Sequence, residues 1–138
     1  MANNQPIFSK IGDIQWSGAS ASAANTTKDM TTGTTYSVFT ADATSGGYVQ
    51  RIRFRPLGVN AATVARIWIN NGSSTSVAAN NILWDEVSLP SSTLSETTAN
   101  TLTELPLNFA LPPGYKIFVT LGSIAAAGYA VTVIGGKY

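Results

Sequence analysis

The chain has 138 residues, a formal net charge of +1 at neutral pH, and neither histidine nor cysteine. It therefore lacks the two side chains that most often transfer protons, act as nucleophiles or bind transition metals near pH 7. Only 11% of its residues are Asp, Glu, Lys or Arg, against roughly 25% in a usual soluble domain. We expect a surface suited to close packing, with no basic stripe for nucleic acid.

The N-terminus and the apolar runs predict a soluble protein of one domain. Residues 1–5 contain neither a basic region nor an apolar core, so no secretory signal is expected. The longest nearly apolar run, residues 124–134, is much shorter than the roughly 20 residues that a membrane helix needs. We therefore expect no membrane partner.

Residues 1–33 differ in composition from the rest of the chain. One strand is expected at about residues 7–14, and the Ser/Ala-rich stretch 17–24 that follows neither alternates nor builds a face. We interpret residues 1–33 as an N-terminal arm with a low-complexity connection, and residues 34–138 as a β-sandwich domain. The alternative is an ordinary first strand plus a surface loop of the same domain.

From residue 34 onward the pattern is typical of β-strands. Seven runs are rich in β-branched and aromatic residues and are bounded by Gly, Pro and Asn. They cover residues 35–40, 48–55, 63–70, 82–89, 105–110, 115–121 and 129–134. With the arm strand they make eight, which predicts an all-β, antiparallel two-sheet sandwich with jelly-roll topology.

Two-residue alternation assigns each strand a core face and an outer face. In the run 48–55, Tyr48 is expected in the core together with Ile52 and Phe54. The opposite face carries three arginines. In the run 63–70 the core residues are expected to be Ala65, Ile67 and Ile69, and in the run 115–121 they are expected to be Tyr115, Ile117, Val119 and Leu121.

Four segments resemble the small β-sandwich virion proteins of tailed bacteriophages, and head decoration or cement proteins in particular. They are residues 51–58 (RIRFRPLG), 65–72 (ARIWINNG), 105–122 (LPLNFALPPGYKIFVTLG) and 131–138 (VTVIGGKY). The resemblance extends over about residues 48–138. It implies a jelly-roll-like domain, commonly a homotrimer, that is assembled in the host cytoplasm. Such a domain binds between subunits of the major capsid protein on the exterior of the virion.

The three arginines are the first candidate for a partner interface. Arg51, Arg53 and Arg55 share one strand face, about 6.7 Å apart, and Arg66 would extend the patch from the next strand. Guanidinium groups bond acidic side chains at two points, so the row fits a partner subunit. The alternative is a solvated face, because neighbouring charges at this spacing repel by only about 0.6 kcal/mol in water.

The tryptophans are the second candidate set. Trp68 is expected to share a face with Arg66, and Trp84 to share one with Glu86. If these faces are outer ones, Trp16, Trp68 and Trp84 are either subunit contacts or a platform for a glycan. The alternative is burial in the core.

No combination of residues in the sequence predicts catalysis. Asp85 and Glu86 are adjacent on a strand, so their side chains leave from opposite faces and cannot flank one glycosidic bond. No Ser-x-x-Lys spacing occurs, and residues 42–47 fit a turn better than a calcium site. We expect a non-enzymatic structural protein without metal or cofactor. A carbohydrate- or receptor-binding module of a phage tail or fibre is the alternative.

Overall fold

The computed structural model of the chain describes residues 10–138, and eight strands form within this range. They are β1 (Ile11–Trp16), β2 (Tyr36–Thr40), β3 (Gly47–Pro56), β4 (Thr63–Asn70), β5 (Asn81–Leu89), β6 (Thr103–Leu111), β7 (Lys116–Leu121) and β8 (Tyr129–Lys137). A short 3-10 helix, Ala78–Asn80, precedes β5. Strands β2 to β8 begin within two residues of the expected positions. The expected first strand lies partly outside the described residues.

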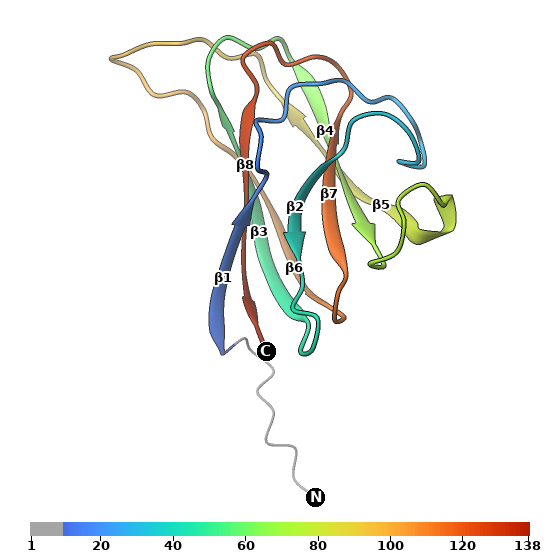
Figure 1. Ribbon diagram of the computed structural model, residues 1–138. Helices are drawn as coiled ribbons and strands as arrows, with labels where there is room; N and C mark the ends of the chain where they lie inside the picture. Colours follow the sequence, from blue (N-terminus) through green and yellow to red (C-terminus); the bar gives the residue numbers. More distant parts are fainter. Residues whose placement is uncertain (1–9) are drawn as a thin grey trace, which may run out of the picture.

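The strands form two antiparallel four-stranded sheets that face each other (Figure 1). The strand order is β1-β8-β3-β6 in the first sheet and β2-β7-β4-β5 in the second. The first strand therefore pairs with the last, the second with the seventh, the third with the sixth and the fourth with the fifth. This order is that of a jelly roll, so the predicted fold class is confirmed.

The core lies between the two sheets and is built from alternate residues of each strand. Burying one such large apolar side chain stabilises a fold by about 1.5–3 kcal/mol. The inward-facing residues of the central strands β3 and β7 are completely buried: Val49, Ile52, Phe54, Ile117, Val119 and Leu121. The described part of the chain contains no helix that is long and apolar enough to cross a membrane.

A β-bulge in β3 corrects one expected face. The pairing of β3 with both β6 and β8 shifts register between Val49 and Arg51, so one extra residue enters the strand and the alternation reverses. Val49 takes the core position expected for Tyr48, and the hydroxyl of Tyr48 instead donates to Asn108 Oδ1 on the outside, at 3.2 Å. Alternation alone does not reveal an inserted residue.

The expected boundary at residue 33 does not separate β1 from the sandwich. Strand β1 pairs with β8 over its whole length. The connection that follows is held by backbone hydrogen bonds between Ala21 and Tyr129 and by a bond from Asn25 N to the carbonyl of Leu121, 2.7 Å long. Within the described residues, β1 is therefore a strand of the sandwich, and the connection after it packs on the sandwich.

Candidate partner-binding surfaces

The outer face of the first sheet brings together residues that are far apart in the sequence. Trp16 on β1 lies opposite Thr132 on β8, which lies opposite Arg53 on β3. One row away, Ile14 lies opposite Ile134, and Ile134 lies opposite Arg51. Because directly paired residues of a sheet point to the same side, three candidate arginines and one candidate tryptophan share a surface. We call it the arginine–tryptophan face: Ile14, Trp16, Arg51, Arg53, Arg55, Thr132 and Ile134.

The β1 side of this face is apolar and exposed. Ile14 is 58% exposed and Trp16 is 66% exposed. A shallow groove of about 160 Å³ runs beside the indole, between residues 16–20, Leu57 and residues 130–132. A tryptophan that is largely exposed to solvent beside a groove is a typical anchor for a macromolecular partner.

The β3 side is basic and held in place by contacts within the chain. Arg53 Nε lies 2.8 Å from one carboxylate oxygen of Glu104, and Arg51 Nε lies 3.7 Å from the other. Arg55 Nη1 donates to the backbone carbonyl of Asn100 at 2.9 Å. The single carboxylate of Glu104 thus lies beside both the Arg51 and the Arg53 guanidinium groups, so the arginine row retains a net positive charge. The pairs are partly exposed and contribute at most about 1 kcal/mol each.

Arg66 does not extend this row, contrary to expectation. Its strand, β4, belongs to the second sheet, so its guanidinium points away from the arginine–tryptophan face. There Arg66 Nε forms an ion pair with Glu86 Oε1 at 3.0 Å. Strands β3 and β4 are consecutive but lie in different sheets, so closeness in sequence does not place these arginines on one surface.

Trp68 is buried, so it does not belong among the exposed interface candidates. It lies on the outer face of the second sheet, as its alternation with Ile67 indicates, but only 1% of it is exposed. Met30, from the connection between β1 and β2, packs on it together with Phe118. Its indole nitrogen donates to Thr120 Oγ1 at 3.0 Å. The burial alternative therefore holds for this residue.

Trp84 lies at the opposite side of the sandwich from Trp16, on the edge strand β5. The register of β5 against β4 shifts around Trp84, and its ring meets Phe109 of β6 edge to face, with centroids 5.0 Å apart. It does not share a face with Glu86, which pairs with Arg66 on the outside of the second sheet. Half of Trp84 remains exposed, next to exposed Ile82 and Leu83.

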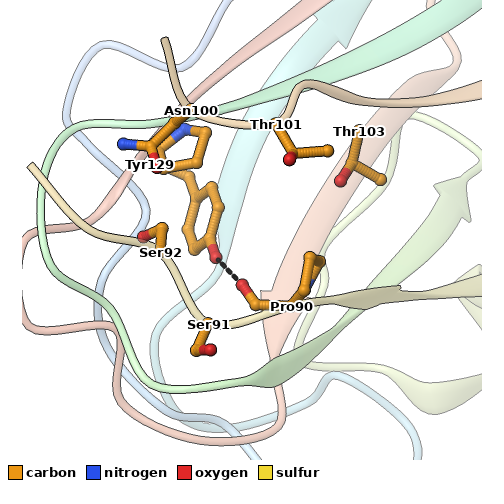
Figure 2. Close-up of a pocket in the computed structure, with 8 residues that line it drawn as sticks. Pro90, Ser91, Ser92, Asn100, Thr101, Thr103 and Tyr129 are labelled. Carbon is orange, nitrogen blue, oxygen red and sulfur yellow. Dashed lines mark hydrogen bonds between the residues drawn. The ribbon is translucent and has the colours of Figure 1, made fainter. Parts of the chain in front are cut away.

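A small polar pocket lies where the connection between β5 and β6 meets β8 (Figure 2). The Tyr129 hydroxyl donates to the carbonyl of Pro90 at 3.4 Å, and Ser92, Asn100 and Thr103 line the pocket. Burial raises the pKa of Tyr129 above its usual value of 10.0. The volume is about 30 Å³, room for one water molecule, whereas small-molecule sites measure about 300–1,000 Å³.

The carboxylates form local structural contacts. Asp85 pairs in register with Ile67 and Glu86 with Arg66, so these two side chains leave the strand on opposite faces, as predicted. Asp42 Oδ1 accepts the backbone N–H groups of Thr44 and Ser45 at 2.9 and 2.8 Å, which makes residues 42–46 a capped turn. No group of three or more Asp, Glu, His or Cys side chains that could hold a metal ion occurs within residues 10–138.

Comparison with known proteins adds no relative: no family model, curated protein or solved structure matches this chain.

Proposed function

We propose that the protein is a non-enzymatic structural protein of a phage virion. In this role it decorates the capsid from outside, by binding between subunits of the major capsid protein as a homo-oligomer. The arginine–tryptophan face carries the proposal, because it places exposed Ile14 and Trp16 beside a row of arginines on a rigid sheet. The jelly roll is a fold of many viral capsid domains, and it supports the proposal only as an analogy of fold.

The proposed contact has an apolar centre and a basic rim. Tryptophan and arginine are the residues that most often dominate binding energy at protein interfaces. A contact of standard size hides about 800 Å² on each partner. The complementary surface on the capsid protein would be apolar opposite Trp16 and acidic opposite Arg51 and Arg53, where guanidinium groups can bond carboxylates.

The test uses heads of the parent phage assembled without this protein. Purified protein is added, and the particles are imaged. We expect ordered density between capsid subunits and greater resistance of the heads to heat. Trp16→Ser and the triple change of Arg51, Arg53 and Arg55 to Ser should each weaken attachment at least tenfold, whereas the control Ile124→Ser, at another exposed apolar site, should not. Particles that stay bare with the wild-type protein would refute the proposal.

The dependence of attachment on ionic strength and pH tests the charged part of the contact. Attachment should weaken with added salt if the arginine row meets acidic groups. It should change little between about pH 6 and pH 8, because the chain has no histidine to titrate in that range. Strong pH dependence there would point to a different contact.

A carbohydrate- or receptor-binding role in a phage tail or fibre is the second candidate. It is favoured by the groove beside Trp16, where the exposed indole adjoins Ser20 and Thr132. An aromatic face beside hydroxyl groups can stack on a sugar ring and bond its hydroxyls. Binding to a glycan array that disappears in Trp16→Ala, with no attachment to heads, would favour this role over capsid decoration.

A further inference from the structure

The four edge strands of the sandwich differ in how open they are to another strand. At β2 the side chain of Gln15 occupies the backbone N–H and C=O of Thr40, at 2.8 and 2.9 Å. Strand β6 contains Pro106, and its Asn108 has a positive φ of 51°. Strand β1 has six residues, among them Gly12 and Asp13. Such features protect edges against pairing.

Strand β5 has such protection only in its second part, where the register shifts at Trp84 and the acidic residues Asp85 and Glu86 follow. It is nine residues long and contains no Pro, Gly, Lys or Arg. Three consecutive apolar residues lie exposed on it: Ile82 (61%), Leu83 (39%) and Trp84 (49%). We call these three residues the β5 apolar block. An exposed apolar segment of an edge strand is a template for strand addition.

We propose that β5 pairs with β5 of a second copy of this chain, antiparallel and about a twofold axis at Leu83. In this register Leu83 lies opposite the partner's Leu83, and Ile82 lies opposite the partner's Trp84 on both sides of the axis. Pairs of an aromatic and a β-branched residue across strands are favourable. Each residue of the β5 apolar block then lies beside a residue of the partner's block, and the two second sheets join into one.

The charges of β5 agree with this register. The acidic residues Asp85 and Glu86 never face their counterparts, because Asp85 lies opposite the partner's Asn81. Glu86 already forms an ion pair with Arg66. The Asp85 carboxylate accepts the N–H of Glu86 at 2.7 Å, so this backbone group is not available to a partner strand. A net charge of +1 adds little repulsion between copies.

The twofold contact differs from the threefold arrangement that the resemblance to decoration proteins implies. It also does not depend on capsid binding, since it concerns the protein in isolation. Failure of attachment to heads and failure of β5 pairing are consequently separate results.

Sedimentation of the purified protein tests the contact. We expect the wild type to sediment as a dimer at about 100 μM and Leu83→Lys as a monomer, because the axis brings the two new charges together. The matched control Leu94→Lys changes another leucine, 66% exposed on the β5–β6 connection, and should stay dimeric. A monomeric wild type, or an oligomer that survives Leu83→Lys, would overturn the proposal. Circular dichroism verifies that each variant folds.

Cross-linking tests the register without a charged residue. The chain has no cysteine, so an introduced one can pair only with its copy. Opposed residues of antiparallel strands have Cα atoms about 4.5–5.5 Å apart, within the range of a disulfide. Leu83→Cys should therefore form a covalent dimer under mild oxidation. The control Ser88→Cys should not, because its copy would lie about 33 Å away. Equal cross-linking of both variants, or none of Leu83→Cys, would contradict the register.

Discussion

Asn60 joins two connections at one end of the sandwich, and its side chain is only 2% exposed. Its Oδ1 accepts the backbone N–H groups of Ala127 and Gly128 at 2.8 and 3.0 Å, and its Nδ2 donates to the carbonyl of Gly128 at 3.0 Å. It thereby links the β3–β4 connection to the β7–β8 connection. The sequence offers no sign of this role beyond an asparagine in a loop, because the partners lie more than 60 residues away.

Replacing Asn60 by alanine should destabilise the protein more than an ordinary loop substitution. The change leaves the buried N–H of Gly128 without a partner, which costs about 1–3 kcal/mol. We expect the free energy of unfolding, measured by urea titration, to fall by about that amount. Asn71→Ala, at an exposed asparagine, should lower the free energy of unfolding by less than about 0.5 kcal/mol. Equal effects of both changes would mean that the Asn60 bonds contribute nothing special.

Asp42 predicts a dependence of stability on acid pH. The N–H groups of Ser45 and Thr44 donate to its carboxylate and lower its pKa below the usual 3.8. A lowered pKa means that Asp42 contributes stability above about pH 4 and loses that contribution as pH falls through the folded-state value. The urea midpoint of Asp42→Ala should therefore lie below that of the wild type at pH 7, and the gap should narrow at pH 2.5.

The variant Asp42→Asn is the matched control for this titration. Its amide oxygen can accept the same two N–H groups at any pH, so the gap between the asparagine and alanine variants should be the same at pH 7 and pH 2.5. If the gap between wild type and Asp42→Ala does not narrow at low pH, the turn is not stabilised through the ionised carboxylate.

At the scale of elements, the positions of strands followed from composition and turns, whereas their irregularities did not. β-Branched and aromatic runs bounded by Gly and Pro located β2 to β8. The bulges near Val49 and Trp84 depend on which residues of the neighbouring strands face them. For that reason alternation assigned Tyr48 and Trp84 to the wrong sides.

The connection between β1 and β2 is an element that composition did not reveal. It crosses the second sheet and is anchored by Tyr36, whose hydroxyl accepts the N–H groups of Ser22 and Ala23 at 3.1 and 2.9 Å. Burial alone would raise the pKa of Tyr36, but these two donors outweigh it and lower the pKa. The connection thus shields Trp68, which would otherwise be an exposed tryptophan on a sheet face.

Met30→Ala tests this cover. Met30 is 1% exposed and contacts the buried Trp68, and removing a buried methionine side chain costs about 2–5 kcal/mol. We expect that loss in urea unfolding, together with a red shift of tryptophan emission from the folded protein. Trp16 and Trp84 are already exposed, so the shift would report Trp68. Unchanged emission and stability would show that the connection does not need this contact.

At the scale of the whole molecule, strand order decides which candidates form a surface. Arg51, Arg53 and Arg55 share a face because they alternate along one strand, which sequence alone could predict. Trp16 joins them only because β8 lies between β1 and β3. Arg66 is excluded because β4 lies in the other sheet. Long-range pairing of this kind depends on the packing of the complete chain, and local patterns do not encode it.

The two proposed surfaces lie on opposite borders of the sandwich, so their effects should be separable. Trp16 is on β1, an outer strand of the first sheet, and Leu83 is on β5, an outer strand of the second sheet. We expect Trp16→Ser to keep the dimer and lose attachment to heads. Leu83→Lys should lose the dimer and keep the intrinsic contact of each copy.

Avidity then predicts how the two changes differ in strength. A dimer that engages two capsid sites can bind about 10²–10⁴ times more tightly than one copy. Leu83→Lys, far from the capsid contact, should therefore raise the apparent Kd for heads by a factor in that range. The affinity of a single copy for a single capsid site should be the same for the variant and for wild-type protein diluted until it is monomeric. If Leu83→Lys leaves attachment to heads unchanged, the dimer does not engage two sites at once, and each copy must attach on its own through the arginine–tryptophan face.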